Sequence, residues 1–439
     1  MHVYPFELVS LIIEKWQSLQ PVGCTDKQTT HPMSDTRKLE DVISTCYQVS
    51  MMREEDRPVN IRLIIVSPEH FPGGQGPPIG FHSILFSTKR PFNEYELRRL
   101  SPAVDFERSL VGIDCTPKTG LHIWGIINSG KRWLQSERGG SKHSNTLPDA
   151  LVIQVNGPGM LTICRGNRTL AVLSGGKVVD SSANVFTSQW MKKLLANDRE
   201  DIIALHEAFR ASATIPAAKV NDEFIESMQF QLLKRIISAT RMAQHGGSFL
   251  IFPGNSPPEL GKDSPHILLK YTFAGDEGLL MQQKLFLRTI ANAATLLADP
   301  DNPDKIITWE DYAGLRHESI YDLEEAFAEQ ARFVASLAAV DGAVVVSGGG
   351  IIGFGGMIVG SLDKLTEIAM ANDTEGKIVT LEKIEGSGSR HRSVYHLCNA
   401  LHTVMAFVVS QDGSVQLAKW RNGIVTCWDL TSSSFTVEA

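Results

Sequence analysis

The segment that most constrains the fold of this chain is a short buried strand that begins at an acid and a glycine. Asp341-Gly342-Ala343 stands at the start of the apolar run AVVVS, whose small and branched residues are typical of a core strand. The carboxylate of Asp341 is then placed just before the N-terminal end of that strand. Gly342 has no Cβ, so a ligand can approach the backbone beside the acid. We therefore expect a sheet with a polar position where this strand begins.

A second signature follows some fifty residues later. The irregular loop EGSGS leads into Gly388-Ser389-Arg390-His391-Arg392, and a helix is predicted over 391–402. Four apolar residues share one face of this helix and hold its first turn against the core: Val394, Leu397, Cys398 and Leu401. The free N–H groups and the dipole of a helix N-terminus favour an anion, and arginine forks bind phosphate oxygens bidentately. One acid and a cationic helix terminus suit a polyphosphate with a nearby hydroxyl.

These residues resemble a known family. The DGA and GSRHR motifs, the strand VMAFVVS and the hairpin SQDGSVQLAKWRNGIVTCWD are similar to the diadenylate cyclase (DAC) domain of DisA-type proteins, which joins two ATP molecules into cyclic di-AMP. The resemblance covers residues 225–430. Less specifically, residues 55–195 resemble the probable sensor domain that precedes some bacterial DAC domains.

The resemblance implies which residues form the site. Asp341 would hold or deprotonate the ribose 3′-OH, because that oxygen is a weak nucleophile until a carboxylate or a metal takes up its proton. Catalysis is assigned to Asp341, Arg390 and His391. ATP binding is assigned to Asp341, Gly342, Ala343, Gly388, Ser389, Arg390, His391, Arg392 and Ser410. A divalent cation, Mg²⁺ or Mn²⁺, would be held by His391 and Asp412.

One position departs from the family pattern, which has a glutamate directly after the VVS strand. This chain has Gln411 there, followed by Asp412. A neutral amide is a poor ligand for a hard divalent cation, which prefers carboxylate oxygen. Three alternatives follow: Asp412 takes the place of the glutamate by a shift of register, metal binding is weakened, or the domain binds nucleotide without turning it over.

Composition excludes several classes of protein. The net charge of −7 disfavours a general nucleic-acid binder, although residues 386–421 carry four basic side chains and one acid, a local charge of +3. The six cysteines lack paired spacing and are expected to be reduced, with no disulfide framework or zinc site. No signal peptide or apolar window of membrane-spanning length is recognised. We expect a cytoplasmic protein with no nucleic-acid or membrane partner.

The predicted class is α/β: a mixed β-sheet flanked by helices, preceded by a smaller β-rich mixed domain. The predicted boundaries are 1–57, an N-terminal helix and a loosely packed segment; 58–198, a sensor domain; 199–221, a helical connector; 222–432, a DAC-like domain; and 433–439, a tail. Helices are expected over 187–197, 200–213, 279–298 and 322–339, and after caps at Asn221 and Ser361.

A glycine motif suggests a different class of function. Gly348-x-Gly350-x-x-Gly353 matches the dinucleotide fingerprint of an oxidoreductase, but GFGGMIV follows where that fold needs a helix, which favours a glycine hairpin. The expected function is therefore a diadenylate cyclase that forms cyclic di-AMP and two pyrophosphates, regulated by the N-terminal domain. Catalysis would require a face-to-face homo-oligomer with one ATP per subunit. The alternative is a catalytically silent sensor of ATP or a cyclic dinucleotide in the same pocket.

Overall fold

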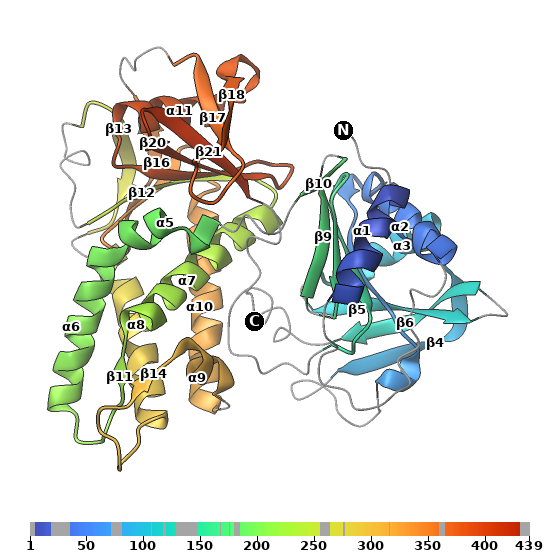
Figure 1. Cartoon of the computed structure of the whole chain (residues 1–439), viewed down its shortest axis with the longest axis horizontal. Coiled ribbons are helices and arrows are strands. Elements are labelled where there is room, and N and C mark those ends of the chain that lie inside the picture. Colours follow the sequence, from blue (N-terminus) through green and yellow to red (C-terminus); the bar gives the residue numbers. More distant parts are fainter. Residues whose placement is uncertain are drawn as a thin grey trace. The chain divides into compact units, whose positions relative to one another are not determined.

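The computed structural model (Figure 1) describes residues 5–18, 36–71, 81–106, 108–116, 120–128, 147–166, 168–174, 176–179, 185–254, 264–274, 277–315, 317–359 and 365–430. The chain forms two compact units. The first comprises Met1–Glu137, Lys142–Ser182 and Thr431–Ala439, and the second comprises Arg138–Ser141 and Ala183–Leu430. The predicted class, a β-rich domain together with an α/β domain, is confirmed.

The first unit is built on an eight-stranded sheet in the order β10-β9-β8-β7-β3-β5-β6-β4. Its strands are β3 (Asn60–Ile65), β4 (His82–Pro91), β5 (Ser109–Thr116), β6 (Gly120–Asn128), β7 (Leu151–Asn156), β8 (Leu161–Arg165), β9 (Arg168–Ser174) and β10 (Lys177–Val179). Only β3 and β5 pair in parallel among these described strands. The other elements are α1 (Pro5–Ser18), α2 (Thr36–Ser50), β1 (Arg53–Glu54), β2 (Arg57–Pro58), η2 (Pro68–His70), α3 (Glu94–Leu100) and η3 (Ser101–Ala103).

The helix α2 corrects one sequence prediction. The segment up to residue 57 was expected to be loosely packed, yet in its described part α2 belongs to the core of the sheet. Its buried apolar residues recur at helical spacing: Leu39, Val42, Ile43, Cys46 and Val49. They pack with Ile61, Ile153 and Ile163 of the sheet. The polar residues between them lie on the solvent side. Because they alternate with the apolar ones, the segment is polar on average, and its composition does not reveal the apolar face of the helix.

The second unit is built on a nine-stranded mixed sheet in the order β13-β16-β15-β12-β19-β20-β21-β17-β18. Its strands are β12 (Gly247–Phe252), β13 (Ile267–Thr272), β15 (Ala343–Ser347), β16 (Gly350–Ile358), β17 (Glu367–Ala371), β18 (Val379–Lys383), β19 (Met405–Val409), β20 (Val415–Arg421) and β21 (Ile424–Leu430). The pairs β12/β15 and β17/β21 are parallel, and the other neighbours are antiparallel.

The helices of this unit are α5 (Gln189–Leu194), α6 (Ala196–Ser212), α7 (Asp222–Met242), α8 (Glu277–Leu296), α9 (Trp309–Gly314), α10 (Glu318–Leu337) and α11 (Ser389–Ala400), with 3₁₀ turns η4 (Val185–Thr187) and η6 (Ile384–Gly386). The short strands β11 (Lys219–Val220) and β14 (Ile306–Ile307) pair in parallel. The predicted cap of α7 is confirmed, because the Asn221 side chain accepts a hydrogen bond of 2.9 Å from the backbone N–H of Phe224. Residues 199–221, expected as a connector, contain most of α6, which packs on α7 and α8.

The two faces of this sheet are covered by different helices (Figure 1). Leu250 and Val408 point to the same side as Val394 and Leu397 of α11 and share one core cluster with them. Because successive side chains of a strand alternate, Phe249 faces the opposite side. Figure 1 shows the layer of α6, α7, α8 and α10 on that opposite side. The sheet is thus held between α11 and a helical layer.

Two local predictions have opposite outcomes. The glycine hairpin is confirmed, since β15 and β16 pair antiparallel directly across Gly348 and Gly349. The helix expected after a cap at Ser361 is wrong in its described part, because Glu367–Ala371 is strand β17, paired with β18 and β21. EIAMA is compatible with a helix locally, but Ile368 is buried in the core of the sheet, which outweighs propensity. Ser361 itself and the predicted tail at 433–439 lie outside the described residues.

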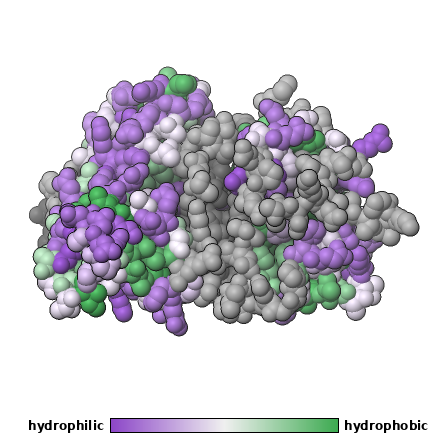
Figure 2. Space-filling model, turned by 60° about the horizontal axis from the view of Figure 1, so that its bottom comes forward, coloured by the Kyte–Doolittle hydropathy of each residue, from purple (hydrophilic) through white to green (hydrophobic). Residues whose placement is uncertain are grey.

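The surface of the second unit exposes several large apolar side chains. They include Leu205 and Phe209 of α6, Met281 of α8 and Phe333 of α10. Figure 2 shows hydrophobic residues among hydrophilic ones on the side of the molecule that is turned forward. Even so, none of the helices in the described ranges is both long and apolar enough to cross a bilayer.

Candidate functional site

The sheet of the second unit brings both sequence signatures to one of its ends. Strands β12 and β15 run in parallel with Ser248 opposite Ala343, so both begin at the same edge. Strand β19 runs the other way, with Val409 opposite Gly247, so it ends at that edge. Since neighbouring strands are spaced by about 4.8 Å, the start of β15 and the end of β19 lie roughly 10 Å apart. Asp341 and Ser410 are therefore placed at the same end of the sheet.

Gly342 is required for a reason different from the predicted one. Its φ is +115°, and a Cβ at this position would lie 2.5 Å from the carbonyl carbon of Gly355 and 2.8 Å from the nitrogen of Gly356. The backbone of β16 occupies the space that the sequence interpretation left for a ligand. Asp341, one residue earlier, is exposed, whereas Ala343 is buried in the sheet. The glycine therefore allows β16 to pass close to the acid.

Helix α11 supplies the cationic terminus that the sequence predicts. It starts at Ser389, two residues earlier than expected, after Gly388 in extended conformation. No side chain of the described residues caps it. Val394, Leu397 and Cys398 are buried as predicted and fix the helix to the sheet. The free N–H groups of its first turn are consequently held in a constant position beside Ser389.

Arg390 extends from this terminus to the edge of the sheet. A Cβ added at Gly246 would lie 2.6 Å from Nη1 of Arg390 and 2.8 Å from the carbonyl oxygen of Val409. The guanidinium therefore lies against the turn that precedes β12 and near the end of β19. Neither Arg390 nor the exposed Arg392 forms an ion pair with a carboxylate of the described residues. Both charges are available for an anionic ligand.

His391 is half-buried and faces two acids. Burial lowers the pKa of His391, while the carboxylates of Asp429 and Asp412 act in the opposite direction. Asp429 is itself held by Gln416, whose Nε2 donates to Oδ1 over 2.9 Å. Gln416 also accepts a hydrogen bond from the hydroxyl of Tyr395. The lowered pKa favours the neutral imidazole, which can accept a proton or bind a metal.

One carboxylate oxygen of Asp412 is hydrogen-bonded within its own turn. Its Oδ1 accepts hydrogen bonds from the backbone N–H and the hydroxyl of Ser414, at 2.9 and 2.8 Å. Two backbone hydrogen bonds close the turn: the N–H of Ser410 donates to the carbonyl oxygen of Ser414, and the N–H of Gly413 donates to the carbonyl oxygen of Ser410. Gln411 beside it is exposed. The acid that follows the VVS strand is thus present at this edge, with one carboxylate oxygen engaged.

The described residues form no cluster of three or more metal ligands. His391 and Asp412 are a pair of donors, and the charge of Asp412 acts on the imidazole. A pair fits Mg²⁺ or Mn²⁺ that is bound mainly by substrate phosphates and water, because such ions often take only one or two protein ligands. It does not fit an all-protein metal site.

The predicted residues therefore fall into two groups. Arg390, His391, Ser410 and Asp412 lie around the start of α11 and the end of β19. Asp341 stands at the same end of the sheet, two strands away. The sequence interpretation missed two neighbours. They are Gly246, which lies against Arg390, and Asp429, whose charge acts on His391; neither belongs to a sequence motif.

Comparisons with known proteins bear mainly on the first unit. Residues 28–128 match the family model described as "Probable sensor domain DACNV", the domain type fused to DAC domains. The match begins before the predicted start at 58 and includes α2, in agreement with the packing of that helix on the sheet. No DAC catalytic domain is matched by a family model. No curated protein matches the chain.

One solved structure is similar to part of the chain. It is described as a hypothetical membrane spanning protein from Bacillus cereus, solved in structural genomics. It is 13% identical, over 55% of this chain and 93% of its own, with a TM-score of 0.23.

Proposed function

We propose that the second unit is a diadenylate cyclase, which condenses two ATP into cyclic di-AMP and two pyrophosphates, and that the first unit regulates it. The proposal is carried by one observation: two arginines that form no ion pair with a described carboxylate stand at a helix N-terminus, and the exposed acid Asp341 lies at the same end of the sheet. The match of residues 28–128 to a probable sensor domain supports a regulated signalling protein.

In this proposal α11 binds the triphosphate. Arg390 and Arg392 donate to phosphate oxygens, and Ser389 and the free N–H groups of the first turn add donors. Such donors are already in position before the reaction, so they stabilise charge that develops on the phosphates without reorganising. The buried face of the helix keeps them in place.

Asp341 acts on the nucleophile. It accepts the proton of the ribose 3′-OH as that oxygen attacks the α-phosphorus of the second ATP. The new ester bond forms while the bond from the α-phosphorus to the bridging oxygen of the β-phosphate breaks, and pyrophosphate leaves. A second, equivalent step closes the ring. Asp341 is exposed, so an ATP bound to a partner subunit can reach it in a face-to-face homo-oligomer.

A divalent cation, Mg²⁺ or Mn²⁺, would offset the charge of the phosphates and of the leaving pyrophosphate. His391 and Asp412 are the residues proposed to hold it, with the phosphates of ATP as its other ligands. The neutral imidazole favoured by burial leaves His391 able to bind.

A silent nucleotide sensor is the second candidate. It is favoured by the turn after β19, where Gln411 is neutral and Asp412 already accepts two hydrogen bonds within the turn. One experiment separates the candidates: incubate the full chain with ATP and Mn²⁺ or Mg²⁺, detect cyclic di-AMP by mass, and measure ATP binding in parallel. Product supports the cyclase, and binding without product supports the sensor. Absence of both would refute the assignment of this site.

A further inference from the structure

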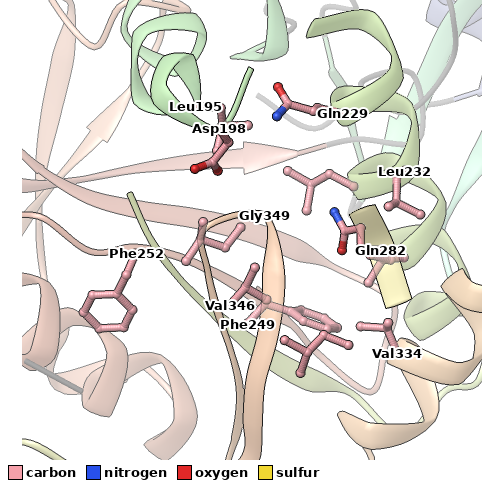
Figure 3. A pocket seen from close by; sticks show the side chains of 14 residues that line it. Leu195, Asp198, Gln229, Leu232, Phe249, Phe252, Gln282, Val334, Val346 and Gly349 are labelled. Atoms are coloured by element: carbon pink, nitrogen blue, oxygen red, sulfur yellow. The ribbon is translucent and has the colours of Figure 1, made fainter. Parts of the chain in front are cut away.

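A cavity lies between the sheet and the helical layer, where Leu232 of α7 and Phe249 of β12 are among the residues that line it (Figure 3). The space between its walls is about 680 Å³, a volume that includes the solvent at its open mouth. The walls come mainly from α7 and β12, with one residue each from α8, α10, β15 and β16. They include Leu232, Ile236, Phe249, Ile251, Val334 and Val346. These side chains make the cavity predominantly apolar.

The cavity is separate from the proposed ATP site. It reaches Val346 and Gly349 at the end of β15, whereas Asp341 precedes the start of that strand. Five residues of strand span roughly 15 Å at 3.3 Å per residue. Phe249 also faces the side opposite to α11. A ligand in this cavity would therefore not compete directly for the phosphate site.

Asp198 is the one acid in this apolar wall. It lies in the first turn of α6, is only 6% exposed, and projects into the cavity in Figure 3. Its carboxylate has no hydrogen bond or ion pair to any residue of the described ranges. The neighbouring Arg199 pairs with Asp222 at 2.9 Å and Glu226 at 3.8 Å, and its charge only partly offsets the effect of burial on the pKa of Asp198. A buried carboxylate without a partner is costly, which indicates that a donor is missing here.

Gln229 of α7 supplies a second acceptor without a donor. Its Oε1 is buried, lines the same cavity, and has no hydrogen-bond partner in the described part of the chain. A smaller hollow of about 320 Å³ adjoins the cavity and is lined by Asp201 and Gln283 in addition to Asp198 and Gln229. Of the described residues that line the two hollows, the charged ones are Asp198 and Asp201. The polar end of the cavity is therefore acidic and rich in acceptors.

We infer that this cavity binds an amphipathic organic cation, an amine or amidine carried on an aromatic or alkyl body. The N–H groups of the cation would donate to the carboxylate of Asp198 and to Oε1 of Gln229, and its apolar body would lie against Leu232, Phe249 and Val334. Such a molecule satisfies both acceptors and buries apolar surface at once. An anion is disfavoured, because it would face Asp198 and Asp201.

The test is isothermal titration calorimetry of the full chain with 4-phenylbutylamine and with the neutral 4-phenylbutanol, which has nearly the same shape. We expect the amine to bind at least about tenfold more tightly, since a hydrogen bond to a charged group contributes enough for that ratio. Equal affinities, or no binding of the amine, would overturn the inference.

Variants locate the site. Asp198→Asn keeps the shape of the side chain and should reduce amine affinity at least about tenfold, with the affinity for the alcohol unchanged. Asp304→Asn removes an exposed carboxylate that pairs with Lys219 and serves as the charge-matched control. If both variants weaken the amine equally, the attraction is general and the inference fails. Gln229→Leu provides an independent check, because it should also weaken the amine but leave the Asp198 carboxylate in place.

Discussion

Arg390 offers the sharpest test of the phosphate site. Its guanidinium lies against Gly246 and the end of β19 and is half-buried. A charge-assisted hydrogen bond contributes about 1.5–3 kcal/mol. Arg390→Ala should therefore weaken ATP binding by about 10- to 150-fold. Arg392 is exposed, and solvent screens its charge, so Arg392→Ala should cause a smaller loss.

The assay is calorimetric titration of ATP at physiological salt, with the melting temperature measured for every variant. Arg390→Lys keeps the charge but loses the planar fork and should lie between wild type and Arg390→Ala. Arg332→Ala is the control, since Arg332 is an exposed arginine that pairs with Glu329 of the same helix. An ATP affinity within twofold of wild type in folded Arg390→Ala protein would show that the phosphates bind elsewhere. An equal loss in Arg332→Ala would point to nonspecific attraction.

Four further outcomes are expected. Asp341→Asn should abolish formation of cyclic di-AMP and leave ATP affinity within about tenfold; turnover in that variant would refute its role. Asp412→Asn should raise the metal concentration needed for activity, because Asp412 is proposed to hold the cation. An unchanged metal requirement in Asp412→Asn, together with a lower one in Gln411→Glu, would instead place the metal at position 411. A truncated protein of residues 183–430, which keeps α6 on α7 and α8, should fold and bind ATP with altered regulation, whereas folded protein without ATP binding would contradict this division. Burial, with a smaller effect of the nearby Asp201, raises the pKa of Asp198 to about 6. The ionised carboxylate therefore destabilises the fold increasingly as the pH rises from about 4 to 6. Asp198→Asn should raise the melting temperature above pH 6, and an equal rise at pH 4 would disprove this.

Local patterns determined much of the second unit. Asn221 caps α7, the apolar spacing of α11 buries the predicted side chains, and the glycine run makes the β15–β16 hairpin. Each of these depends on contacts between residues close in sequence or on a strong period, and both are visible without a structure.

The rest was decided by contacts between distant segments. EIAMA became strand β17 because β18 and β21 pair with it, and Gly342 is needed because the backbone of β16 passes beside it. Asp198 looks like an ordinary solvated acid in the sequence of α6. Only the packing of α6 near α7, α8 and the end of β15 buries its carboxylate beside an apolar cavity. Burial is a property of the folded chain, because the surrounding atoms come from elements far apart in the sequence.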